Sequence, residues 1–170
     1  MKVAENNTLK KEIKEILKLC DEAKEEYGEK ASYFNEGASE SEIEAWESKN
    51  GIKIPESYKD WLKFSADCQI RDTLASFFFP RLVNIVPEDL VLIGNLIGDG
   101  EVLCFSKTTG KFVRYFEGQV NDEMDTFKEM LKEIIRMMKG DSGISEEAEK
   151  LFMQFMKNAE ERKRKREGDN

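Results

Sequence analysis

The chain has 170 residues, of which 39% are hydrophobic and 36% are charged, and its formal net charge is −8. This length suits one domain with an appendage, and eleven Phe, two Trp and four Tyr exclude a wholly disordered chain. The charged N-terminal stretch lacks the apolar centre of a signal peptide, and no apolar run approaches the roughly 18 residues of a membrane span. The three cysteines form no CxxC pair, so we expect reduced thiols and a cytoplasmic protein.

Three amphipathic helices are predicted in the first 64 residues. The first covers residues 8–27, the second begins at a capping box formed by Ser39 and Glu42, and the third begins at Pro55. Their apolar stripes are Leu9, Ile13, Ile16, Leu17, Cys20 and Ala23, then Ile43 and Trp46, then Tyr58, Trp61, Leu62 and Phe64. Both tryptophans are therefore expected in the core rather than at an interface.

Short apolar runs follow from residue 77 onward and predict strands. The runs are 77–79, 83–86, 90–95, 101–105 and 111–116, with turn residues at 98–100 and 107–110. The spacing leaves no room for crossover helices, so the strands should be antiparallel. Since residues 101–105 are apolar on both faces, the middle of the sheet should be covered twice, by helices or by a partner.

Two further helices are predicted toward the C-terminus. Asp122 caps the first, and Ser145 starts the second, whose apolar stripe includes Leu151 and Phe155 and which runs into a basic tail at 162–166. The fold class is therefore α+β: a single antiparallel β-sheet, a meander, packed with N-terminal and C-terminal helices. We expect a core domain at residues 1–139 and an appended helix with a basic tail at 140–170. The short linker that contains Gly140 and Gly143 favours docking of that helix on its own chain, which gives a monomer, over exchange with a second copy, which gives a dimer.

Catalytic patterns are missing from the sequence. There is no histidine, which excludes Ser-His and Cys-His pairs and most zinc sites. Thr109-Gly110-Lys111 is followed by Phe112, where a phosphate-binding loop needs Ser or Thr. Cys20 and Cys104 lie in apolar patterns, which leaves Cys68, placed in a loop, as the one candidate exposed thiol. We predict no catalytic residue, no cofactor and no metal, although carboxylate chemistry alone stays open.

Charge is distributed unevenly along the chain. Residues 157–170 carry a net charge of +2, which leaves −10 for residues 1–156. An acidic body repels nucleic acid and attracts a basic protein, although acidity can also serve solubility alone. The cationic tail can complement a helix dipole or form a nucleic-acid patch, and the sequence favours the first interpretation.

Residues 38–62 resemble the leading motif of the SUKH superfamily. Glu47, Gly51, Ile54-Pro55, Tyr58 and Leu62 match that motif at its spacing, and the resemblance continues through Ile93-Gly94, Gly98-Asp99-Gly100, Gly110 and Val113 to the helix at 124–135. It spans about residues 8–136. The chain departs from the family at residues 65–68, where members often have Asn-Gly. Glu47, Pro55, Tyr58 and Gly100 are expected to be structural.

The resemblance implies helices packed around one antiparallel sheet and a role that needs no catalysis. Bacterial members look like immunity proteins that bind and block a cognate polymorphic or contact-dependent toxin, commonly a nuclease, and fungal relatives are regulators. We therefore predict an immunity protein acting by occlusion of a basic toxin, with a regulatory or scaffold module as the alternative. The acidic loops supply the predicted partner-binding residues Asp67, Asp72, Asp99 and Glu101.

Overall fold

The computed structural model describes residues 3–28, 31–71, 74–96 and 100–140. The chain divides into two compact units, Met1–Ile135 and Arg136–Asn170, and all the described strands lie in the first. The helices are α1 Lys10–Glu22, α2 Lys24–Tyr27, α3 Glu40–Asn50, α4 Glu56–Phe64 and α5 Phe127–Met138, the last of which crosses the boundary. The strands are β1 Tyr33–Phe34, β2 Asp67–Ile70, β3 Ala75–Arg81, β4 Leu90–Leu96, β5 Glu101–Ser106, β6 Phe112–Phe116 and β7 Gln119–Met124.

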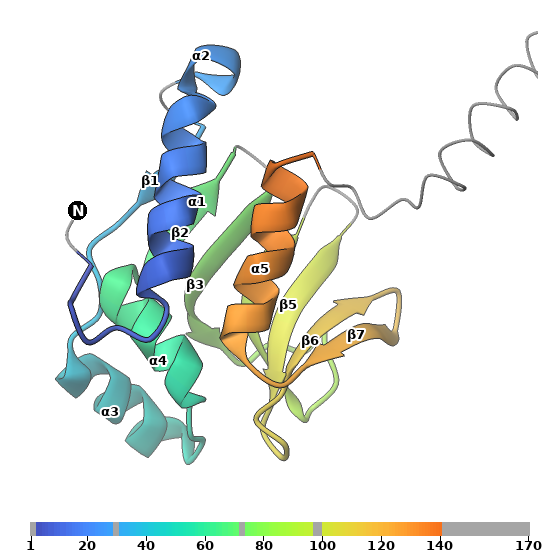
Figure 1. The fold of residues 1–170 in the computed structure, drawn as a ribbon. Helices are drawn as coiled ribbons and strands as arrows, with labels where there is room; N and C mark the ends of the chain where they lie inside the picture. Colours follow the sequence, from blue (N-terminus) through green and yellow to red (C-terminus); the bar gives the residue numbers. More distant parts are fainter. Residues whose placement is uncertain (1–2, 29–30, 72–73, 97–99, 141–170) are drawn as a thin grey trace, which may run out of the picture. The chain divides into compact units, whose positions relative to one another are not determined.

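The described strands form one sheet in the order β1-β2-β3-β4-β5-β6-β7, and every neighbouring pair is antiparallel. The predicted α+β meander is confirmed, with α1, α4 and α5 over one face of the sheet (Figure 1). The hairpin predicted at 107–110 joins β5 to β6, and β4 pairs with β5 as a hairpin at 98–100 requires, although residues 98 and 99 lie outside the described residues. Glu117 and Gly118, both with positive φ, form the two-residue turn between β6 and β7, since such turns match the twist of the strands.

An aromatic cluster fills the space between the helices and the sheet. Phe127 of α5 lies at its centre, with its ring centroid 4.8 Å from Tyr58, 5.0 Å from Phe77, 5.4 Å from Phe112 and 5.6 Å from Trp61. All five side chains are fully buried. The Tyr58 hydroxyl donates to the carbonyl of Phe78 at 2.7 Å, so its one polar atom is satisfied inside the core. The helix face of the sheet is thus covered by rings from separate elements.

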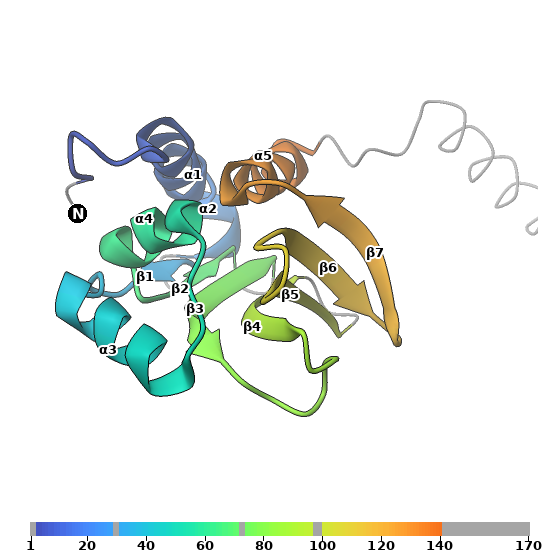
Figure 2. The same cartoon turned by 90° about the horizontal axis from the view of Figure 1, so that it is seen from below.

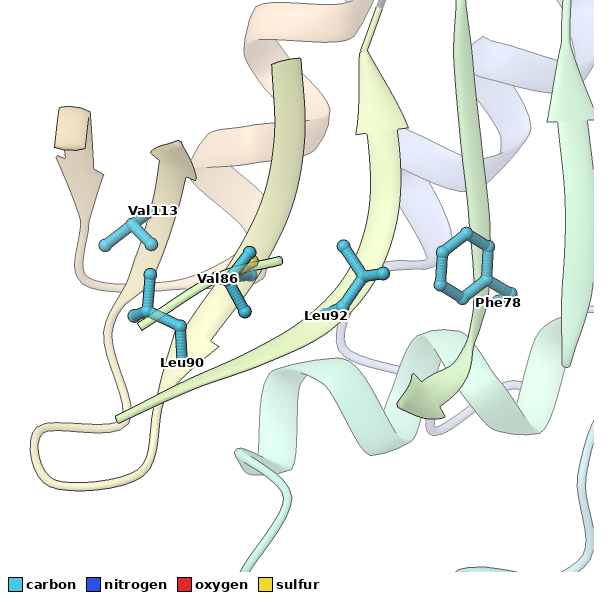
Figure 3. Close-up of a cluster of buried hydrophobic side chains, with 6 residues drawn as sticks. Phe78, Val86, Leu90, Leu92 and Val113 are labelled. Carbon is cyan, nitrogen blue, oxygen red and sulfur yellow. The ribbon is translucent and has the colours of Figure 1, made fainter. Parts of the chain in front are cut away.

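The opposite face carries a smaller core, shown in Figure 3. Phe78, Leu90, Leu92, Cys104 and Val113 project from β3 to β6, and Val86 reaches them from the loop at 82–89. Figure 2 shows this loop on the side of the sheet away from the helices. Within the predicted run 101–105, Cys104 is thus covered on this face by a loop rather than by a helix or a partner, whereas Val102 stays half-buried.

Four predicted elements are corrected by the structure. The helix expected at 8–27 breaks at Ala23, which separates α1 from α2. Residues 83–86 form part of a loop rather than a strand, since Val83 and Val86 turn inward while Leu82 and Ile85 face solvent. Asp122 lies in strand β7 and does not cap a helix, and α5 begins only at Phe127. Residues 67–70, expected to be an acidic loop, form strand β2. The helix predicted from Ser145 lies outside the described residues.

Candidate protein-binding surface

The four predicted partner-binding acids do not form one patch in the part of the chain that the structure describes. Asp67 is the first residue of β2 and pairs with Phe78 in β3, whereas Ile70, at the other end of β2, pairs with Ala75. Ala75 pairs with Leu96, and Leu96 pairs with Glu101. Asp67 and Glu101 therefore lie toward opposite ends of the strands. Asp72 and Asp99 lie outside the described residues.

Each described acid already has a partner within the chain. An Asp67 carboxylate oxygen accepts a hydrogen bond from the Asn35 side-chain amide at 2.9 Å. Glu101 forms a two-pronged pair with the Arg114 guanidinium, at 3.0 and 2.8 Å, and its side chain is only 13% exposed. The hydrogen bonds that the Arg114 guanidinium donates to Glu101 raise the pKa of Arg114, so the two charges largely cancel. Asp67 therefore presents its charge to solvent more freely than Glu101 does.

A row of uncharged side chains crosses all seven described strands. Direct cross-strand partners share a face of a sheet, and the register links each member of the row to the next. The members are Tyr33, Gln69, Ser76, Asn95, Val102, Tyr115 and Val120. We call these seven residues the cross-strand row. Val102 and Tyr115 pack against the smaller core, so the row lies on the face away from the helices.

Every member of the cross-strand row is at least partly open to solvent. Tyr33 is 42% exposed and Val120 is 51% exposed, and the five residues between them are exposed or half-buried. The neighbouring row on the same face, which includes Phe78, Cys104 and Val113, is buried beneath the loop at 82–89. The loop thus covers one part of this face, and the row beside it is left exposed or half-buried.

A second apolar feature lies on the outer side of the same loop. Leu82 is 48% exposed and Ile85 is 65% exposed. Leu82, Val83, Val86 and Leu90 line a pocket of about 400 Å³, with Glu88 and Lys107 also in its lining. The charges that border this pocket are of both signs, so its electrostatics select no particular partner.

Sequence reasoning did not find the cross-strand row. Its members are spread over 88 positions, from Tyr33 to Val120, and three of them lie in strands that were not predicted. The Glu117-Gly118 turn between two runs of strand-forming residues was the available signal for β7.

Glu47, one of the motif residues, anchors the turn between α3 and α4. One carboxylate oxygen accepts from the Ile54 backbone N–H at 2.8 Å and lies 3.0 Å from the Lys59 ammonium, and the other accepts from Lys53 at 2.7 Å. Burial raises the pKa of Glu47, but these hydrogen bonds outweigh it and bring the value to about 2. A buried carboxylate with this many donors is structural, as the sequence suggested.

Nucleophilic and metal chemistry finds no support among the described residues. All three cysteines are buried, and burial raises the pKa of both Cys68 and Cys104 to about 12. The prediction that Cys68 is an exposed thiol is wrong, because residues 67–70 form a strand that turns Cys68 toward the helices. No group of three or more Cys, Asp or Glu side chains suited to a metal ion occurs in the described ranges.

A search of the described helices for one that is long and apolar enough to cross a membrane found none. Comparison with protein-family models gave one match: the SMI1 / KNR4 family (SUKH-1) model aligns with residues 37–133, more than half of the chain. That range contains six of the seven members of the cross-strand row, all except Tyr33. No curated protein sequence matched the chain.

Proposed function

The chain belongs to the SMI1 / KNR4 family (SUKH-1), and on this premise we propose that it is an immunity protein that binds and neutralises a cognate toxin. The proposed toxin is a basic protein, with a nuclease as the favoured class. The chain blocks it in the cytoplasm by covering its working surface. The observation that carries the proposal is the family match together with a net charge of −10 over residues 1–156. Opposite net charges accelerate encounter, and an acidic inhibitor fits the basic substrate face of a nuclease.

The proposal keeps Asp67, Asp72, Asp99 and Glu101 as contacts with the toxin, but it ranks them. Of the two described acids, Asp67 contributes more to toxin binding. The Asn35 amide that bonds it is neutral, whereas Glu101 is paired with the positive charge of Arg114. An interface that includes both must reach both ends and both faces of the sheet, because Asp67 shares a face with Phe78, whereas Glu101 shares one with Leu103 and Phe105. The complex contains one copy of this chain.

The test measures protection of a host that expresses the protein encoded by the adjacent gene. Reversing the charge of Asp67, Asp72, Asp99 and Glu101 to Lys should abolish most of the protection. The matched control reverses four exposed acids elsewhere, Glu22, Glu25, Glu44 and Glu88, and so changes the net charge equally. Parental binding should also weaken as salt rises, chiefly through a slower association rate.

Full protection by the first variant would move the interface elsewhere and reject the four contacts. If the adjacent gene's product is harmless and does not bind the parental chain, the immunity proposal itself fails. A regulatory or scaffold role, the alternative from the sequence, would then take its place.

A further inference from the structure

The cross-strand row has an unusual composition for this chain. Charged residues make up 36% of the sequence, yet the seven members of the row include none. They are two Tyr, two Val, Gln, Ser and Asn. Depletion of charge and enrichment of tyrosine distinguish the centres of protein interfaces from the rest of a protein surface. The row therefore has the composition of an interface centre.

The fold does not need the row to be uncharged. A sheet face that meets only water normally carries polar and charged side chains, as Glu123, opposite Val113, does on β7. Asn95 is exposed in the central strand β4, where a lysine or glutamate could stand, and its amide reaches only the Ser76 hydroxyl, at 3.4 Å. Val120 at the far end of the row is 51% exposed without being needed in the core.

Acidic residues border the row among the described residues. Asp67 lies two positions before Gln69 in β2 and therefore shares its face of the sheet. Partial burial raises the pKa of the Tyr33 hydroxyl, and the nearby negative charge of Asp67 raises it further. Glu117, in the turn after β6, follows Tyr115 by two positions. A centre without charge and an acidic border fit a partner with a basic border.

We propose that the cross-strand row is the centre of the surface that binds a basic protein toxin, with Asp67 on its border. This proposal rests on the proposed immunity function and locates the toxin-binding site on the sheet. A second copy of the chain is the weaker occupant, because it would bring two acidic bodies, each of −10 over residues 1–156, face to face. The partner packs a surface across the strands and contacts Tyr33 and Tyr115 as its aromatic anchors.

The experiment uses one substitution at two places. Asn95→Arg puts a long cation at the middle of the row, and Asn84→Arg puts the same cation on the exposed loop at 82–89. The two variants have equal net charge, so any long-range electrostatic effect on association is shared. The probe is the purified product of the adjacent gene in a catalytically inactive form, and its dissociation constant is measured by titration calorimetry with the full chain.

We expect Asn95→Arg to weaken binding at least tenfold relative to Asn84→Arg, with unchanged thermal melts for both. Tyr115→Ala should weaken binding by a similar factor, since truncated aromatic anchors dominate interface energetics. Equal affinity of the two arginine variants would overturn the proposal and leave the immunity function standing. A parental chain that does not bind the probe removes both. A parental dimer that Asn95→Arg dissociates makes the row a self-association surface, which also overturns the proposal.

Discussion

The two faces of the sheet bury apolar side chains in different ways. On one face, helices α1, α4 and α5 bring large aromatic side chains onto the strands, and Phe127 contacts four other rings. On the other face, the loop at 82–89 covers a cluster of mostly aliphatic side chains, and the cross-strand row beside it stays exposed or half-buried. The helix face therefore serves stability, while the other face combines a smaller core with the proposed binding surface.

The largest effect should come from removing the centre of the helix-face core. Phe127→Ala deletes a ring that is fully buried against four others, and such truncations cost about 3–5 kcal/mol of unfolding free energy. Urea denaturation followed by tryptophan fluorescence measures the loss, because Trp61 contacts Phe127. A loss below about 1 kcal/mol would contradict the view that this face dominates stability.

The second prediction concerns the turn that holds α3 to α4 on the helix side. The folded pKa of Glu47 is about 2, below its usual value of 4.5, so the carboxylate favours folding at any pH above that usual value. This contribution, on the order of 2–3 kcal/mol, is lost as the pH falls from about 5 through 2, because protonation breaks the bonds to Lys53 and Lys59.

Glu47→Gln should therefore be less stable than the parental chain at pH 7, and the difference should shrink toward pH 2. Urea midpoints measured between pH 7 and 2 give the comparison. Glu42→Gln is the control in an exposed capping box, where a much smaller change is expected. A stability difference that stays constant with pH would show that the Glu47 charge is not what holds the turn.

The contrast between the two faces also explains what the sequence could predict. The turn at 107–110, the capping box at Ser39 and the buried stripes of α1 and α4 are local signals, and the structure contains them all. The turn at 98–100 lies largely outside the described residues, but β4 and β5 pair as it requires. Asp122 was a competing local signal, because an acidic residue before an apolar stripe is typical of a helix start. Here the Glu117-Gly118 turn prevailed and made the segment a strand.

The cross-strand row could not be predicted in the same way, because it depends on register. The register shifts between Phe77 and Arg81, between Leu92 and Gly94, and between Arg114 and Tyr115. A shift of one residue moves a strand's side chains to the other face of the sheet. Gly94 shows the local cause, since a side chain there would lie 2.2 Å from the carbonyl oxygen of Ser76. Such contacts join residues that are far apart in the sequence, so they leave no periodic pattern in it.

The smallest predicted effect is a difference between two identical substitutions, one on each face. Leu62 of α4 is fully buried under the helices, and Leu92 of β4 is 6% exposed beneath the loop at 82–89. The cost of Leu→Ala depends on how far the surroundings can close the cavity, and ranges over about 2–5 kcal/mol. Helices fixed by interlocking rings cannot move inward easily, whereas a loop held mainly by Val83 and Val86 can.

We expect Leu62→Ala to cost about 4 kcal/mol and Leu92→Ala about 2 kcal/mol in unfolding free energy. Urea denaturation of both variants under one buffer gives the difference directly. Equal costs would mean that the loop is as rigid a cover as the helices. In that case the distinction between a stability face and a binding face would rest on the cross-strand row alone.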